Sequence, residues 1–239
     1  MALPKVPVSL YEVTLPSNGS KVTYRGFLGK EEKILLLAME SEEQEQINMS
    51  LKQIVTNCTE GSVDPSILPI YDVEFLFLNI IAKSVGEELN LDVLCENCKE
   101  EIAYKTNIYD IDVPVLVKGA DIVKFSENIG IKLKYPTIDT YDYVDTILDI
   151  EGTESSEAIY EALTMHGDYI YDEDGVYYLK DQTKEEIAEF FGNLTGAQMA
   201  DIKKFFAEMP AISETIEFKC PHCEHQNNYE VRGIHQLFM

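Results

Sequence analysis

The chain has 239 residues, of which 45% are hydrophobic and 10% aromatic, so it can bury the core of one or two globular domains. Its 19 Lys and Arg residues stand against 43 Asp and Glu residues, which gives a net charge of −24. Nucleic-acid binding needs a basic face that neutralises phosphates, so this composition excludes that role. The acidic groups are spread over the whole sequence, which favours either solubility or attraction of a basic protein partner.

Two observations argue against export and membrane insertion. No apolar stretch reaches the length of about 18 residues that a membrane span needs, because the richest segment, VEFLFLNIIAKSVG, is interrupted at Asn79 and Lys83. The opening residues, MALPKVPVSLYEV, contain no basic-then-apolar leader. We therefore expect a soluble, intracellular protein without a membrane partner.

The amino-terminal part of the sequence predicts a β-hairpin followed by helices. Two alternating segments rich in Val, Tyr and Thr flank the turn sequence PSNG, and apolar residues at helical spacing follow them. The expected elements are strands at 9–15 and 21–27 and helices that begin at Lys30, cover 42–58 and cover 73–85. The last of these is strongly apolar and is expected to be the central helix of an amino-terminal domain.

Four of the five cysteines form two CxxC pairs, Cys95/Cys98 and Cys220/Cys223. Their surroundings are similar, LNLDVLCENCKEEIAYKTNI and ETIEFKCPHCEHQNNYEVRGI, and each predicts a β-hairpin with its cysteines near the turn. Two such hairpins brought together present four thiolates at the corners of a tetrahedron, the ligand set of a structural zinc ribbon with one ion. Because protein sulfur atoms fill all four positions, such a zinc is structural rather than catalytic.

Other interpretations of the cysteines stay open, namely a metal-free ribbon, a redox dithiol and disulfides. Thioredoxin-like redox pairs lie where a strand meets a helix, whereas both pairs here lie between strand-like segments. Disulfides are typical of exported proteins, for which the sequence has no leader. His222 and His225 flank the second pair and are weaker ligand candidates. Cys58 lies in a helical pattern and is expected to be a buried, small apolar residue.

The segment between the two cysteine pairs predicts a mixed, mostly helical insertion. Its expected elements are an extended stretch at 110–118, a hairpin from IVKF to IKLKYP, helices at 138–150 and 155–165, a Tyr-rich hairpin in YIYDEDGVYYL, and helices at 183–191 and 195–209. Thr183 and Glu186 have the spacing of a capping box. DEDG resembles part of a calcium loop, but Ile170 stands where the EF-hand pattern requires an acid, so a hairpin turn is the preferred interpretation.

Together these elements predict an α+β fold in three parts. The parts are a hairpin-and-helix domain at 1–86, a split zinc ribbon formed by 87–110 and 212–239, and the insertion at 111–211. Closing so long a loop costs entropy, which bonds between metal and thiolates can offset. We therefore expect removal of zinc to unfold more than the ribbon.

The sequence carries little that suggests catalysis. It has no nucleophile elbow, Walker loop, Rossmann fingerprint or HExxH motif. Three of its four histidines, His222, His225 and His235, lie near the carboxyl end, and His166 stands alone. The 14 Tyr and 10 Phe residues suit packing and interface contacts. We therefore predict a protein without catalytic residues that acts by contact with other proteins.

Several segments resemble the T4-like bacteriophage baseplate hub family. The opening, LPKVPVSLYEVTLPSNGSKVTYRGFLGKEEKILLLAMES, has that family's order of a strand, a Pro-Ser turn and a strand leading into a YRxFLxKEEKxLLxAxES-like stretch. Gly26 departs from it, since a proline or a similar residue is expected there. The resemblance continues through YDVEFLFLNIIAKSVGEELNL, the cysteine pairs, KYPT and the ending FFAEMPAISETIEFKCPHCEHQNNYEVRGIHQLF.

The resemblance implies a non-enzymatic late protein of a contractile-tailed phage that helps to build the central hub of the baseplate. Its implied partners are other hub or tail proteins, and its implied locations are the host cytoplasm during assembly and the virion tail baseplate. It would act as a hub component or as an assembly chaperone, and it could form an oligomer. Two other hypotheses rest on the residues alone: an acidic zinc-ribbon regulator of a polymerase or another host protein, and an enzyme that uses the zinc.

Overall fold

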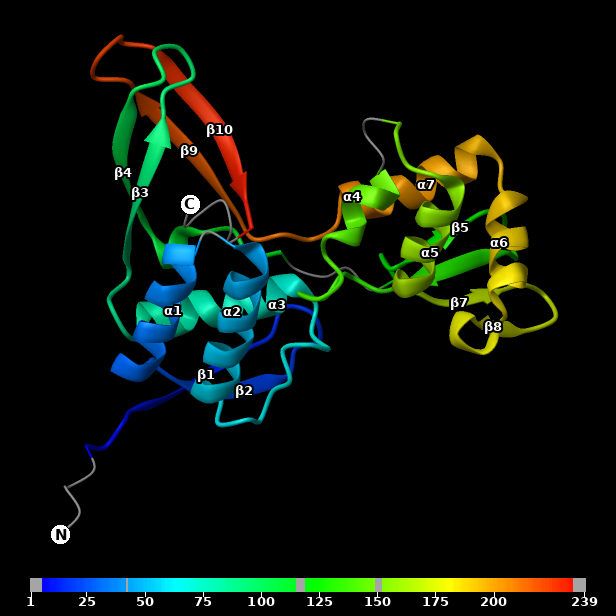
Figure 1. The fold of residues 1–239 in the computed structure, drawn as a ribbon, viewed down its shortest axis with the longest axis horizontal. Helices are drawn as coiled ribbons and strands as arrows, with labels where there is room; N and C mark the ends of the chain where they lie inside the picture. The colour runs from blue at the N-terminus through cyan, green and yellow to red at the C-terminus, as the bar shows by residue number, and fades with distance from the viewer. Residues whose placement is uncertain (1–5, 42, 115–118, 149–151, 234–239) are drawn as a thin grey trace. The chain divides into compact units, whose positions relative to one another are not determined.

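The computed structural model describes residues 6–41, 43–114, 119–148 and 152–233 (Figure 1). This described part contains seven α-helices and four small antiparallel sheets, so the predicted α+β class is confirmed. The chain divides into two compact units, Met1–Val115 with Pro210–Met239 and Leu116–Met209. The first unit is therefore built from two separate segments of the chain. None of the described helices is long and apolar enough to cross a membrane.

The first unit begins with the predicted hairpin and helices. Their bounds are β1 (Leu10–Thr14), β2 (Lys21–Arg25), α1 (Gly29–Ser41), α2 (Gln44–Cys58) and α3 (Ile70–Ala82). Of the 13 residues in α3, all but Phe75 are buried, so the prediction of a central helix is confirmed. This helix begins at Ile70 rather than at 73, because the Pro69 carbonyl already accepts hydrogen bonds from the N–H groups of Asp72 and Val73.

A buried ion pair joins β2, α1 and α2. The guanidinium of Arg25 lies 3.1 Å from the Glu31 carboxylate and also donates to the Asn57 carbonyl oxygen at 3.2 Å. Glu31 in turn accepts a hydrogen bond from the backbone N–H of Leu28, which precedes α1. Burial opposes both charges, yet these hydrogen bonds hold the pKa of Glu31 below its usual value and that of Arg25 above it. The pair therefore fixes the two helices on the hairpin.

Both cysteine-bearing segments form hairpins, as predicted. The first consists of β3 (Glu88–Leu94) and β4 (Glu101–Asn107), and the second of β9 (Ser213–Lys219) and β10 (Gln226–Arg232). The two hairpins lie side by side (Figure 1). Between them, the ring centroids of Tyr104 and Phe218 are 6.5 Å apart. The Thr106 hydroxyl donates to the buried Glu214 carboxylate at 2.7 Å. Inward-facing residues alternate with exposed ones along each strand.

Two hydrogen-bonded residues lie close to the points where the chain leaves and re-enters the first unit. Asp112 and Ser213 form an antiparallel bridge with N–H···O distances of 2.9 and 3.1 Å. The prediction of an extended stretch at 110–118 is wrong at its start, because a short 3₁₀ helix, η1 (Ile108–Asp110), precedes the bridge. The Asn107 side chain caps that helix by accepting the N–H of Tyr109. Residues 115–118 lie outside the described part.

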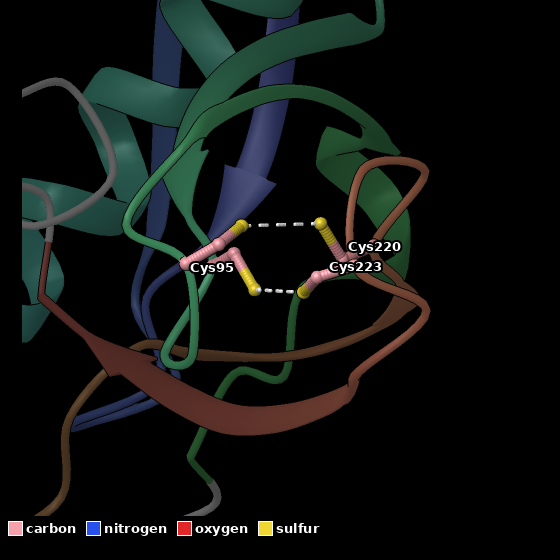
Figure 2. Close-up of side chains that lie close together, drawn as sticks. Cys95, Cys220 and Cys223 are labelled. Carbon is pink, nitrogen blue, oxygen red and sulfur yellow. Dashed lines mark hydrogen bonds between the residues drawn. The ribbon is translucent and has the colours of Figure 1, made fainter.

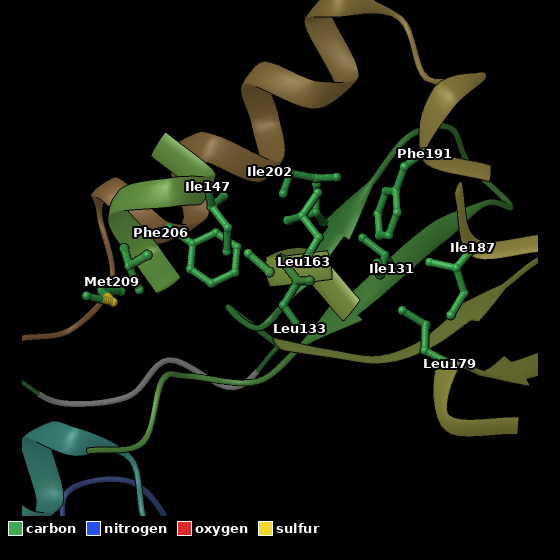
Figure 3. Packing of buried hydrophobic residues seen from close by; sticks show 13 residues of the cluster. Ile131, Leu133, Ile147, Leu163, Leu179, Ile187, Phe191, Ile202, Phe206 and Met209 are labelled. Carbon is green, nitrogen blue, oxygen red and sulfur yellow. The ribbon is translucent and has the colours of Figure 1, made fainter. Parts of the chain in front are cut away.

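The second unit combines a four-stranded sheet with helices. Its elements are β5 (Ile122–Lys124), β6 (Gly130–Leu133), α4 (Tyr143–Leu148), α5 (Ser156–His166), β7 (Gly167–Tyr171), β8 (Val176–Tyr178), η2 (Leu179–Asp181), α6 (Lys184–Gly192) and α7 (Gly196–Ala207). The strands lie in sequence order and each pair of neighbours is antiparallel. Figure 3 shows its core, in which Ile131 and Leu133 of the sheet pack among Leu163, Ile202 and Phe206 of the helices. This unit thus has a hydrophobic core of its own.

Local hydrogen bonds explain which predictions hold in this unit. The capping box of Thr183 and Glu186 is confirmed, and a second one joins Thr195 and Gln198 at the start of α7. The Tyr-rich hairpin is also confirmed, since the Asp172 carboxylate in its turn accepts the backbone N–H groups of Asp174 and Gly175 at 2.8 and 3.0 Å. These bonds are those of an Asx turn.

The helix predicted at 138–150 begins only at Tyr143. The Thr140 hydroxyl accepts the N–H of Thr137 at 3.0 Å, and the Thr140 carbonyl accepts the N–H of Tyr143 at 3.2 Å. A threonine side chain that bonds a nearby backbone N–H in this way competes with helix formation, so the residues before Tyr143 form turns. Residues 149 and 150, the predicted end, lie outside the described part.

His166 is a titratable group inside the core of the second unit. Its side chain is buried, with 1% of the residue exposed, and its ring lies edge-on to that of Phe206 at 5.3 Å. Among the described residues Nε2 has no hydrogen-bond partner. Burial lowers the pKa of His166 to about 4, with a smaller contribution from the charge of Lys134, although the Thr140 carbonyl favours the protonated ring.

This burial predicts that the second unit loses stability in acid. The unfolded chain protonates the histidine below pH 6.5, whereas the folded protein does so only near pH 4, so stability falls over that window. We expect a loss of about 2 kcal/mol between pH 7 and pH 5 that His166→Asn does not show. Urea unfolding at the two pH values measures the difference, and hydrogen exchange of α5 and α7 assigns it to this unit. Equal pH slopes in the two proteins would contradict the prediction.

Candidate metal centre

The two hairpins bring four sulfur atoms together. The Sγ atoms of Cys95, Cys98, Cys220 and Cys223 all lie within 4.8 Å of one another, and they are the group among the described residues that could hold a metal ion. Sγ of Cys95 lies 3.6 Å from Sγ of Cys223, and Sγ of Cys98 lies 3.7 Å from Sγ of Cys220 (Figure 2). Each contact joins one hairpin to the other. The cysteines are free thiols, because a disulfide requires about 2.05 Å between its sulfur atoms.

The first cysteine pair lies in a tight turn between β3 and β4. The N–H of Cys95 donates to the Glu100 carbonyl at 2.9 Å, and the N–H of Lys99 donates to the Cys95 carbonyl at 2.9 Å. Lys99 adopts a left-handed backbone conformation with φ of 61°, which is uncommon for a residue with a side chain. This turn carries the chain from one strand to the next and directs both sulfur atoms to the same side.

The second cysteine pair lies in a turn of the same construction. The N–H of Cys220 donates to the His225 carbonyl at 2.9 Å, and the N–H of Glu224 donates to the Cys220 carbonyl at 2.9 Å. Glu224 has φ of 60° at the position that corresponds to Lys99. The two turns therefore share hydrogen bonds and backbone strain, although their sequences share only the cysteines and the strand pattern around them.

Asn227 connects the two turns from a buried position in β10. Its Oδ1 accepts the backbone N–H of Glu96 at 2.9 Å, across the interface between the hairpins. Its Nδ2 lies 3.6 Å from Sγ of Cys95 and 3.2 Å from the His225 carbonyl oxygen, so it donates toward both. Sequence reasoning missed this residue. A buried strand position that carries an amide two residues after a cysteine turn is the signal that could have indicated it.

Hydrogen bonds favour a thiolate at Cys95. Burial by itself raises the pKa of this thiol, but the backbone N–H groups of Cys98 and Asn97 and the Asn227 side chain donate to its sulfur and lower the pKa to about 6. A deprotonated sulfur is the form that binds metal ions. The backbone of the first turn and Asn227 therefore prepare Cys95 as a ligand.

The other perturbed thiols of the group shift in opposite directions. The N–H of Glu100 lowers the pKa of Cys98, but burial and contact with the three other sulfur atoms raise it to about 12. The Asn97 side chain and the backbone N–H of His225 lower the pKa of Cys223. Thiolates this close repel each other, and a divalent cation between them would stabilise all four deprotonated forms together.

The side chains of the remaining predicted candidates are not part of the sulfur group. His225 points to the Glu96 carboxylate, with Nε2 at 4.0 Å from its oxygen, and His222 is exposed. Cys58 is fully buried in α2, as predicted, and burial raises the pKa of its thiol to about 11. Its surroundings are not purely apolar, because the Arg25 guanidinium lies 3.6 Å from its sulfur.

Comparison with known families matched the chain from residue 8 to residue 239 to the family described as T4 bacteriophage base plate protein. Comparisons with curated proteins and with solved structures gave no match. Gly26, the departure in the opening motif, lies against the end of α3, where a Cβ atom would be 2.8 Å from the Lys83 carbonyl oxygen. The family match covers both hairpins, both cysteine pairs and the inserted unit. The chain belongs to the T4 bacteriophage base plate protein family.

Proposed function

We propose that this protein builds the central hub of the phage baseplate, without catalysis, through contacts with other hub or tail proteins. The observation that carries the proposal is the match to the base plate family. This match extends over residues 8–239 and therefore includes both units of the chain. The resemblance of the opening and ending segments to hub proteins supports the finer assignment. The protein acts as a hub component or as an assembly chaperone, first in the host cytoplasm and, as a component, in the virion tail.

The charge and the exposed aromatic residues suit a contact role. A net charge of −24 attracts basic partner surfaces and resists premature association of the free protein. The edge strand β8 exposes Val176, Tyr177 and Tyr178 next to the acidic turn that begins at Asp172. Tyrosines at an accessible edge are typical of protein interfaces. This combination supports a basic partner that also offers apolar contacts.

We further propose that the four cysteines hold one structural zinc ion. A tetrahedral site with zinc–sulfur bonds of about 2.3 Å has sulfur–sulfur edges of about 3.8 Å. The contacts of 3.6 and 3.7 Å between Cys95 and Cys223 and between Cys98 and Cys220 fit such edges. Residues 87–110 and 212–239 would then form a split zinc ribbon between an amino-terminal domain, 1–86, and an insertion, 111–211. Four thiolates complete the coordination, which leaves the ion a structural role.

Zinc should be present at one ion per chain and should stabilise the first unit. We expect a chelator to lower the melting temperature of this unit by more than about 10 °C, because metal binding is coupled to folding. Metal analysis should find no bound zinc in Cys98→Ser, whereas Cys58→Ala, which alters the thiol outside the group, should retain the full amount. Identical melting curves with and without chelator, or zinc retained by Cys98→Ser, would refute the site.

Asn227 should strengthen metal binding. We expect Asn227→Ala to weaken zinc affinity by about 10- to 100-fold, because the Cys95 sulfur loses a hydrogen bond and the two turns lose their connection. Competition with a chromophoric chelator measures the affinity. Asn228→Ala is the matched control, since this neighbouring amide is exposed and donates to Glu217 at 3.0 Å, and the variant should bind zinc normally. An Asn227→Ala affinity equal to that of the control would show that the contact has no role in metal binding.

The hub role is tested in infected cells. A tagged copy that replaces the phage gene product should co-purify with identified hub proteins from tail-assembly intermediates, because assembly requires direct contact. Mass spectrometry of those intermediates and of purified virions separates the two modes of action: a component is present in both, and a chaperone in intermediates alone. A protein recovered free of every tail protein, from cells that assemble tails normally, would contradict the proposal.

A further inference from the structure

Helix α1 has more apolar surface than its neighbours bury. Residues 34–39 read ILLLAM, so apolar side chains point in every direction around this part of the helix. Ala38 is buried and Ile34 and Leu35 are half-buried, but Leu36 and Leu37 are each 55% exposed and Met39 is 45% exposed. A helix that is apolar on all sides is normally covered on all sides. The exposed side of α1 is therefore a candidate interface.

The exposed side has a defined pattern. Lys33, Leu36, Leu37 and Glu40 are all exposed and follow the spacing i, i+3, i+4, i+7, which places them in one stripe along the helix. We call these four residues the α1 stripe. It is symmetric about its centre, with two leucines in the middle and one charge at each end. The two end charges have opposite signs.

Within the described part of the chain, neither end charge of the α1 stripe, Lys33 or Glu40, forms an ion pair with another residue. They cannot pair with each other, because seven residues of helix separate them by about 10.5 Å. Exposed charges at both ends of an apolar pair therefore remain available to a second molecule.

We propose that the α1 stripe binds the same stripe of a second copy of this chain, antiparallel and across a two-fold axis. In an antiparallel pair centred between Leu36 and Leu37, each Lys33 lies opposite the Glu40 of the other copy, and each Leu36 lies opposite Leu37. A two-fold interface requires this kind of self-complementarity. A stripe whose two end charges had the same sign would repel the stripe of the other copy. The α1 stripe instead places opposite charges against each other at both ends.

The charge of the whole chain sets the strength of the dimer and its response to salt. Each copy carries −24, so the two copies repel at low ionic strength, and added salt screens that repulsion. One helix pair buries less than the standard interface of roughly 1,600 Å², so we expect dissociation in the micromolar range. Salt screens this repulsion between distant charges more than the attraction within the close Lys33–Glu40 pairs, so dimerisation should strengthen with salt, whereas binding of a basic partner at this face would weaken with it. The inference depends neither on the hub role nor on zinc.

The test is the oligomeric state of the purified protein by analytical ultracentrifugation, from about 1 to 200 μM in low and high salt. We expect a monomer–dimer equilibrium that Leu36→Ala combined with Leu37→Ala weakens at least about 100-fold. Leu94→Ala is the matched control, because this leucine is 57% exposed and lies on the outer side of β3. The Leu94→Ala protein should dimerise like the wild type. A wild-type monomer at every concentration and salt level would overturn the proposal.

The charges test the antiparallel arrangement. Lys33→Glu and Glu40→Lys should each weaken the dimer about tenfold, because each places like charges opposite one another twice. The double variant with both changes restores opposite charges across the two-fold axis and should regain wild-type dimerisation. Circular dichroism confirms that the exposed substitutions leave the fold intact. A double variant as weak as the single ones, or a dimer unaffected by the leucine changes, would overturn the arrangement.

Discussion

The convergence of four sulfur atoms from two hairpins is the constraint on which the first unit depends. Cys98 and Cys220 lie 122 positions apart in the sequence, yet their sulfur atoms are 3.7 Å apart. Joining such distant segments costs chain entropy, which local propensity cannot offset. Three contacts between the hairpins offset part of this cost: Tyr104 against Phe218, Thr106 to Glu214, and the Asn227 amide to the Glu96 backbone. A bound metal would contribute further stabilisation.

The connection to the inserted unit follows from the same constraint. Because Asp112 and Ser213 are hydrogen-bonded to each other, the chain leaves the first unit close to where it returns. The inserted residues can then fold around a core of their own, in which a four-stranded sheet packs with α5, α6 and α7. We propose that partners bind two exposed surfaces, the acidic, Tyr-rich edge of the inserted unit and the exposed side of α1.

Most of the fold could be predicted from local patterns. Alternating residues predicted every hairpin, and the Thr183–Glu186 spacing predicted the start of α6, because these signals act between neighbours in the chain. Two of the errors arose where a side chain bonds the backbone of a nearby residue. Thr140 delays α4 until Tyr143, and the cap that Asn107 provides for η1 places Asp110, the first residue of the predicted extended segment, in a 3₁₀ helix. The spacing of apolar residues does not indicate such bonds, since they depend on the direction of one side chain.

The sequence by itself determined the α+β class, the acidic surface and the four candidate ligands, because CxxC spacing between alternating segments and the count of charged residues require no knowledge of distant contacts. Only the tertiary structure decided that all four sulfur atoms meet, that His222 and His225 stay outside the group and that Asn227 supports Cys95. It also decided which apolar residues of α1 are covered. The physical reason is that burial and hydrogen bonding between remote segments depend on how the hairpins and helices pack, which residue order alone does not specify.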